Sequence, residues 1–240
     1  FKAKSGTAIL LPDAKGSAAM AVACFGPDAD LWTWSAVAEK LPAGDYELVS
    51  GSDIANDIAD DISLGWALAA YRFDRYLDDE APARACLIWP ATCDRAAVEA
   101  MYAAVSLTRD LVNTPAADLG PAELATIAGE LAEANGASFH EIVGDDLVTE
   151  NYPMVHAVGR ASDRAPRLID LGWGDEDHPK ITLVGKGVCF DSGGLDLNPA
   201  SGMEIMKKDM GGAATVLGLA SLIMTAALPV RLRVLIPAVE

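Results

Sequence analysis

An α/β fold is predicted by the way strand-like and helix-like segments alternate along this sequence. Short β-branched runs such as 181–184 suit buried strands, and Ala- and Leu-rich segments of helical spacing such as 96–111 lie between them. Hydrophobic residues make up 51% of the 240 residues, which is enough for one large domain or two modest ones. Such alternation favours a mostly parallel sheet flanked by helices, with any ligand at the carboxyl ends of the strands.

The first part of the chain, residues 1–95, is expected to form a small α/β domain. Trp32, Trp34, Trp66 and Trp89 fit core packing better than a ligand-stacking face, because aromatic side chains dominate protein cores. The predicted elements, in chain order, are a strand at 18–25, a helix at 32–41, a strand at 46–49, a helix at 56–75 and a strand at 83–89.

A linking helix over 96–115 is predicted to lead into a second, mixed-sheet domain over 116–240. The helix ends at Asn113-Thr114-Pro115, because a residue before proline avoids the helical region. Pro121 begins the next helix, which Asp118 is expected to cap. The further predicted elements are a helix at 121–135, a strand at 138–143, a short helix at 145–151, a turn and strand at 155–159, strands at 167–173, 181–184 and 188–190, a hairpin tip at 175–177, a helix ending near 227 and a strand at 230–236.

Charge and hydropathy limit the classes of partner. Lys and Arg number 18 against 35 Asp and Glu, so the net charge is −17 at pH 7, which repels nucleic acid and anionic membrane surfaces. No charge-free apolar stretch of about 20 residues is present, so we expect no membrane span and no membrane partner. The sequence begins with Phe1 rather than Met and without a signal peptide, so we expect its start to be cut.

The cysteines and histidines favour a reduced, cytoplasmic protein without a histidine metal site. No pair of the four cysteines has CxxC spacing, and all lie among apolar residues, so we expect buried free thiols. Free thiols suit the cytoplasm. The three histidines are scattered without metal-site spacing and are read as structural or surface residues. These residues are Cys24, Cys86, Cys93, Cys189, His140, His156 and His178.

The residues best suited to chemistry gather around glycine-rich turns late in the chain. Asp191 and Asp209 offer hard carboxylate oxygens, which divalent ions such as Mg or Mn prefer. Lys186 follows an apolar run, and a lysine enclosed by apolar strands near a cation loses its proton readily and becomes a nitrogen donor. The alternative is a solvated Lys186, with the two carboxylates paired to Lys207 and Lys208.

These turns resemble a known enzyme family. VGKGVCFDSGG at 184–194 and KKDMGGAA at 207–214 are similar to the motifs of the M17 leucyl aminopeptidases, cytosolic enzymes that carry two metal ions. The resemblance continues over 65–76 and 109–124, and no comparably specific match precedes Leu64. These motifs are long and contiguous, so the resemblance is specific.

The resemblance implies roles for individual residues. Lys186 and Asp191 would be metal ligands, with Asp191 shared between two divalent ions (Mn, Zn or Mg). Asp209 would bind the more loosely held ion. Residues 116–240 would then be an incomplete metallopeptidase catalytic domain.

Three departures from the family pattern bear on activity. Asn198 stands where the family has a second lysine that polarises the substrate carbonyl, and an uncharged side chain stabilises the transition state less. Glu204 occupies a position that is usually apolar. Family members also continue to a later motif with Asp and Glu ligands and an Arg, whereas this sequence stops at Glu240, so we expect it to be a fragment.

Three hypotheses about function follow. The first is part of a two-metal aminopeptidase that acts on peptides with N-terminal Leu or another apolar residue, and that forms hexamers as the family does. The second is an impaired family member that binds metal or partners without turnover, which Asn198 favours. The third is a nucleic-acid-binding module, against which the net charge of −17 argues.

Overall fold

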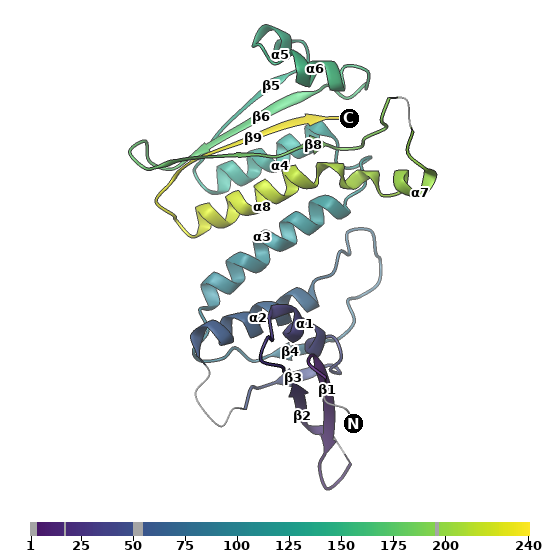
Figure 1. The fold of residues 1–240 in the computed structure, drawn as a ribbon, viewed down its shortest axis with the longest axis vertical. Coiled ribbons are helices and arrows are strands. Elements are labelled where there is room, and N and C mark those ends of the chain that lie inside the picture. Colours follow the sequence, from purple (N-terminus) through teal and green to yellow (C-terminus); the bar gives the residue numbers. More distant parts are fainter. Residues whose placement is uncertain (1–3, 17, 50–54, 195–196) are drawn as a thin grey trace. The chain divides into compact units, whose positions relative to one another are not determined.

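The computed structural model describes residues 4–16, 18–49, 55–194 and 197–240 (Figure 1). Helices and strands alternate, so the predicted α/β class is confirmed. The chain divides into two compact units, residues 1–102 and 103–240, and helix α3 (Arg95–Asn113) contains the boundary.

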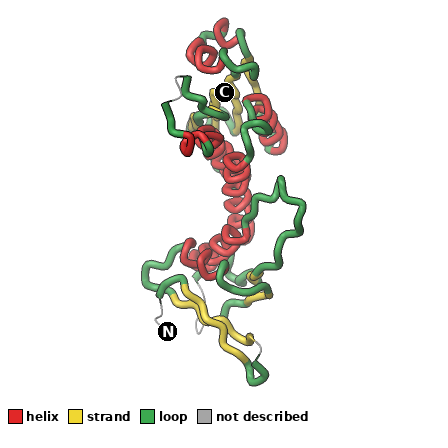
Figure 2. Tube along the Cα trace, turned by 90° about the vertical axis from the view of Figure 1, so that its right-hand side faces the viewer, coloured by secondary structure: helices red, strands yellow, loops and turns green. Residues whose placement is uncertain are grey.

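In the N-terminal unit, the described residues form two separate two-stranded sheets, helices α1 and α2 and the start of α3 (Figure 2). β1 pairs antiparallel with β2, and β3 pairs parallel with β4. The elements are β1 (Thr7–Pro12), β2 (Ala18–Cys24), α1 (Leu31–Ala38), β3 (Gly44–Tyr46), α2 (Asn56–Ala70) and β4 (Ala85–Leu87). Sequence analysis missed β1, placed β3 two residues late and ran α2 five residues too far, because the backbone at Tyr71 turns extended (φ −57°, ψ 134°).

Close helix packing organises this unit. A Cβ on Gly65 would lie 2.2 Å from the carbonyl oxygen of Leu31, so only glycine lets α2 approach α1 this closely. The Trp66 indole N–H donates to the Ala85 carbonyl (2.8 Å) and joins α2 to β4. The prediction that Trp32, Trp34, Trp66 and Trp89 pack in a core is wrong for Trp32 and Trp89, which are 56% and 38% exposed.

The second unit is built on one mixed sheet. Its strand order is β5-β6-β9-β7, with β8 also on β9. β6 runs antiparallel to β5 and β9, whereas β7 and β8 run parallel to β9. The elements are α4 (Pro121–Ala134), β5 (Ser138–Val143), α5 (Asp146–Thr149), α6 (Pro153–Gly159), β6 (Arg167–Trp173), β7 (Lys180–Val184), β8 (Gly187–Val188), α7 (Ala200–Met203), η1 (Met206–Met210), α8 (Gly211–Thr225) and β9 (Arg231–Val239).

The expectation of a mixed sheet is confirmed, since β6 alone runs opposite to β5, β7, β8 and β9. One expectation about a connection is wrong. Residues 175–177 are not a hairpin tip, because the segment leads from β6 to β7 and these strands lie on either side of β9. The alternation of strands and helices in a sequence does not reveal strand direction when a later strand lies between two consecutive ones, as β9 lies between β6 and β7.

Helices cover both faces of the sheet. α4 and α8 pack on one face, and α5 and α6 lie over the other (Figure 1). Alternate β9 residues, Leu232, Val234 and Ile236, are at most 1% exposed and form the centre of the core under α4 and α8. The segment 155–159, predicted as a turn and strand, belongs to helix α6.

The cap of α4 also differs from the prediction. Gly120, rather than Asp118, is the N-cap residue. The Glu123 carboxylate accepts a hydrogen bond from the backbone N–H of Gly120 (2.9 Å). The side chain that caps this helix is therefore Glu123 in its first turn, and not Asp118.

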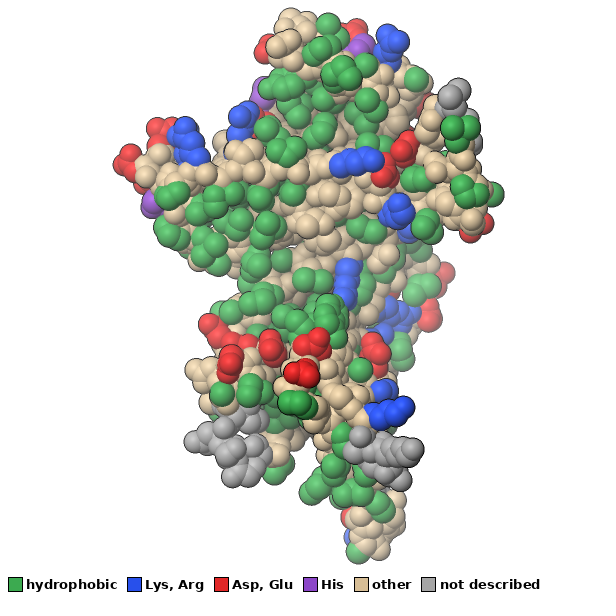
Figure 3. Space-filling view, viewed as in Figure 1, with side chains coloured by type: hydrophobic (Ala, Val, Ile, Leu, Met, Phe, Trp, Pro, Cys, Tyr) green, Lys and Arg blue, Asp and Glu red, His purple; other side chains and the backbone are tan. Residues whose placement is uncertain are grey.

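Surface features agree with the charge balance. No helix among the described residues is long and apolar enough to cross a membrane. Acidic side chains gather on the surface of the N-terminal unit in the view of Figure 3. The four cysteines are free, but the expectation that all are buried is wrong: only Cys189 is buried, and Cys86 is exposed.

The Cys189 thiol should resist alkylation. Burial, followed by the negative charge of Glu240, raises its pKa to about 12. A thiol with that pKa is about one part in ten thousand thiolate at pH 8, and the thiolate is the reactive form. Iodoacetamide at pH 8 should therefore modify Cys86 and spare Cys189 in the native protein, as peptide mass spectrometry would show. Modification of Cys189 at the rate of Cys86 would contradict the buried placement.

α4 and α8 end in the same backbone motif with different residues. At α4, the N–H groups of Gly136 and Ala137 donate to the carbonyls of Glu133 and Ala132, and Gly136 has φ +64°. At α8, Ala227 and Leu228 make the equivalent bonds, and Ala227 has φ +48°. Both are Schellman caps, whose left-handed residue is normally glycine.

Exchanging the cap residues should move stability in opposite directions. Ala227→Gly should raise the free energy of unfolding by about 1 kcal/mol, because glycine relieves the left-handed strain. Gly136→Ala should lower it by a similar amount. Urea unfolding followed by circular dichroism measures both. A less stable Ala227→Gly variant would show that the entropy of the unfolded chain outweighs the strain.

Candidate metal centre

Close backbone packing fixes the place of Lys186. The N–H of Gly185, directly after β7, donates to the Leu235 carbonyl (3.0 Å), so pairing with β9 extends past the strand. A Cβ on Gly185 would lie 2.6 Å from a Val216 methyl and 2.7 Å from the Gly212 carbonyl oxygen. Glycine at 185 therefore lets α8 touch the sheet where Lys186 emerges.

The start of α8 binds the backbone of Lys186 directly. The N–H of Ala213, in the first turn of α8, donates to the Lys186 carbonyl (2.9 Å). A Cβ on Gly212 would lie 2.9 Å from the Lys186 nitrogen. The GKG and GGAA segments of the two motifs are thus the two sides of one contact.

Asp209 reaches the same place from η1. Met206 and Met210, at 9% and 1% exposed, anchor this short helix in the core. The Asp209 side chain is 17% exposed, and its Oδ2 lies 2.7 Å from Lys186 Nζ. This buried oxygen has the ion pair but no partner in hydrogen-bond geometry among the described residues. The ion pair compensates the charge of this oxygen, which can still accept a further hydrogen bond or bind a metal ion.

The pairing differs from both readings of the sequence. The Lys186 side chain is 57% exposed, so it is not enclosed between apolar strands. Asp209 does not pair with Lys207, whose ammonium instead donates to the Asn113 carbonyl at the end of α3, and Lys208 is exposed. The carboxylate therefore faces a lysine from another segment rather than its sequence neighbours.

Asp191 and Asn198 make no hydrogen bond or ion pair with Lys186 or Asp209. Asp191 follows β8, whose pairing with β9 ends at the hydrogen bond from the Cys189 N–H to the Val239 carbonyl (2.8 Å). It makes no hydrogen bond or ion pair with any other residue that the structure describes. Asn198 is exposed in the loop before α7 and is likewise not bonded to Lys186, Asp191 or Asp209. Leu195 and Asp196 of this loop lie outside the described residues.

The donor set fits part of a metal site. Lys186 and Asp191 follow the parallel strands β7 and β8, and Asp209 lies in η1. An amine and carboxylates suit divalent ions, and the buried Asp209 Oδ2 can accept a further partner. The described residues contain no group of three or more His, Cys, Asp or Glu side chains able to hold a metal ion. Any complete two-ion site needs further ligands.

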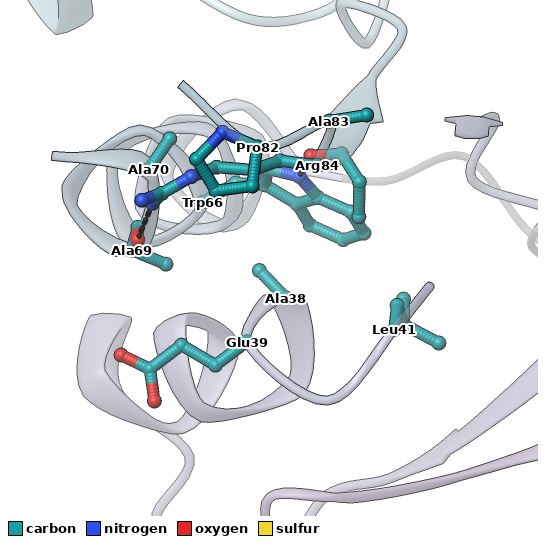
Figure 4. A pocket seen from close by; sticks show the side chains of 10 residues that line it. Ala38, Glu39, Leu41, Trp66, Ala69, Ala70, Pro82, Ala83 and Arg84 are labelled. Carbon is teal, nitrogen blue, oxygen red and sulfur yellow. Dashed lines mark hydrogen bonds between the residues drawn. The ribbon is translucent and has the colours of Figure 1, made fainter. Parts of the chain in front are cut away.

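A separate cavity in the N-terminal unit carries none of these residues. It has a volume of about 250 Å³ and lies between the ends of α1 and α2 and the segment before β4 (Figure 4). Its walls include Ala38, Trp66 and Ala85, which are the small core of that unit. The cavity is therefore a packing depression over this core.

Sequence reasoning missed two cations that bind main-chain carbonyls at and after the end of α3. Lys207 was considered only as a partner for a carboxylate. Arg164 donates to the carbonyls of Ala116 (2.6 Å) and Ala117 (2.8 Å), and its Nε lies 3.4 Å from Glu240 Oε2. Both cations bind main-chain carbonyls of distant segments, and such partners leave no spacing signal in a sequence.

Comparison with known proteins matches both units. The catalytic-domain model of the cytosol aminopeptidase family matches residues 106–240, and the N-terminal domain model of M17 aminopeptidases matches residues 1–90. The second match corrects the expectation that nothing before Leu64 is specific.

Individual relatives agree with this match. A probable cytosol aminopeptidase of Sinorhizobium fredii is 36% identical over 203 residues, which are 77% of this chain and 41% of that protein. The crystal structure of a cytosol aminopeptidase from Coxiella burnetii superimposes with a TM-score of 0.92 at 44% identity, covering 100% of this chain and 52% of that one. The bottromycin maturation enzyme BotP in complex with Mn matches with a TM-score of 0.83 at 33% identity, covering 100% and 55%.

The extent of these matches decides what they establish. The chain spans 41% of the Sinorhizobium relative and about half of the two matched structures. Its own length is nevertheless covered almost throughout by the two domain models. The chain belongs to the cytosol aminopeptidase family, M17.

Proposed function

We propose that the intact protein is a metal-dependent aminopeptidase that releases N-terminal amino acids, preferably Leu-like ones, from peptides. The observation that carries this proposal is the contact of Lys186 Nζ with the buried Asp209 Oδ2 (2.7 Å), because both atoms belong to the two family motifs. Relatives named cytosol aminopeptidase support the reaction class.

Lys186, Asp191 and Asp209 would hold two divalent ions. Carboxylate oxygens suit Mn and Mg better than Zn, and Mn is favoured because BotP has been crystallised in complex with Mn. When bound, such ions polarise a peptide carbonyl and activate water for hydrolysis. Three ligands are too few to enclose two ions, so the proposal includes further ligands from the part of the relatives that this chain does not span.

The residues of this chain have distinct tasks in that scheme. Lys186 must give up a proton to act as a ligand, so metal uptake is coupled to proton release. The hydrogen bond from α8 to its carbonyl holds its backbone in place, whichever partner its side chain would bind. Asp209 lies in η1 and supplies the ligand oxygen Oδ2, which accepts no hydrogen bond from any described residue.

A second candidate function is metal binding with impaired turnover. Asn198 favours it, because an amide at the carbonyl-polarising position donates a hydrogen bond without a positive charge. A hexameric assembly and a cytoplasmic location, both implied by the resemblance, belong to the proposal. Nucleic-acid binding is disfavoured by the net charge of −17, and DNA retention at low salt would revive it.

Removing the Asp191 carboxylate should remove metal. In the intact protein, Asp191→Ala should lose at least one of two Mn ions by elemental analysis. Peptidase activity should fall by more than the roughly 10- to 100-fold typical of residues that only support a ligand. Asp61→Ala, the same change at an exposed position of α2, is the matched control and should keep both ions. Full Mn content in Asp191→Ala would remove this residue from the ligand set.

Restoring a charge at Asn198 should speed turnover. Asn198→Lys should raise kcat on a leucyl chromogenic peptide by about tenfold or more, since donors to a developing oxyanion contribute about 10²- to 10³-fold. Asn198→Met lengthens the side chain without a charge and serves as the control. Inactive wild type with active Asn198→Lys would favour the second candidate function. Equal or lower kcat in Asn198→Lys would exclude the carbonyl-polarising role of this position.

A further inference from the structure

Lys207 makes an unusual bond for a residue beside a candidate metal ligand. It lies in η1 two residues before Asp209, and its half-buried ammonium donates to the carbonyl oxygen of Asn113, the last residue of α3. The last carbonyls of a helix lack intrahelical donors and carry partial negative charge. A lysine there forms a charge-assisted bond, which is stronger than a neutral one.

The short η1 helix depends on such anchors for its orientation. A 3₁₀ segment of five residues has few hydrogen bonds of its own, and their geometry is poorer than in an α-helix. Met206 and Met210 fix η1 to the core through non-directional apolar contacts. The bond from Lys207 adds a directional constraint, which decides where the intervening Asp209 points.

The carbonyl that Lys207 binds belongs to a turn that is itself held. Arg164 donates to the carbonyls of Ala116 (2.6 Å) and Ala117 (2.8 Å), a few residues after Asn113. Gly120 makes room for this guanidinium, because a Cβ there would lie 2.3 Å from Arg164 Nη1. The turn 113–117 therefore receives cations from two separate segments.

We propose that Lys207 is a positioning residue, which aims Asp209 at the metal centre by tying η1 to the end of α3. The inference rests on the proposed function. Lys207 does not contact Asp209 through an ion pair, so it acts through the backbone of η1 rather than by neutralising the carboxylate. Its neighbour Lys208 is exposed and carries the same charge without this bond.

That difference between neighbours provides a matched experiment. Lys207→Met removes a positive charge together with the bond to the Asn113 carbonyl, whereas Lys208→Met removes the same charge and leaves that bond in place. Lys207→Arg keeps a cation that can reach the carbonyl. Mn binding to the intact protein is measured by electron paramagnetic resonance of free Mn, and kcat and KM are measured over a range of Mn concentrations. Thermal unfolding in the absence of metal reports stability separately.

Lys207→Met should weaken the lower-affinity Mn site by about 10- to 100-fold, and its kcat should recover as Mn is raised. KM for the peptide should change less than about threefold, and both Lys207→Arg and Lys208→Met should bind Mn like wild type. If Lys207→Met does not fold, Lys207→Gln, which keeps a donor without charge, should show an intermediate loss.

The inference is overturned if Lys207→Met lowers only the unfolding temperature while Mn binding stays at the wild-type level. It is also overturned if Lys208→Met loses as much Mn affinity, since charge alone would then explain the effect. A wild-type protein that neither binds Mn nor hydrolyses peptides would overturn the proposed function and this inference together. If the wild type is active and Lys207→Met has wild-type Mn binding and kcat, this inference alone is overturned.

Discussion

The hydrogen bond from the Ala213 N–H to the Lys186 carbonyl (2.9 Å) is the contact on which the candidate centre depends. It joins the residue after β7 to the first turn of α8, and the glycines at 185 and 212 are needed to bring these backbones together. A side chain at either position would separate the strand from the helix by more than a hydrogen bond can span. Lys186 and η1 would then no longer face each other.

The sheet gives this contact its rigidity. Leu232, Val234 and Ile236 of β9 are almost fully buried, and β9 pairs with β6, β7 and β8. β7 and β8 pair in parallel with successive stretches of β9, so Lys186 lies between two paired strands and Asp191 follows the second. Glycine packing thus places the backbone of the centre, while apolar burial keeps the edge from shifting.

Sequence patterns predicted what depends on local chemistry. Strands β5 and β6 were predicted to the residue, since their alternation and flanking turns are local signals. The direction of β6, the helix at 153–159 and the exposure of Lys186 were not predicted, because each depends on a neighbour distant in sequence. The same limit hid the bonds of Lys207 and Arg164, whose partners are backbone carbonyls that any residue could supply.

Main-chain carbonyls as partners make these anchors independent of the side chain at the accepting position. A cation that binds a carbonyl depends on where the chain passes rather than on which side chain stands there. Asn113 offers Lys207 its backbone oxygen, so the anchor persists for any residue at 113 that keeps the end of α3 in place. The backbone around Lys186 and Asp209 is therefore held by glycines, which allow close approach, and by cations that bind main-chain carbonyls.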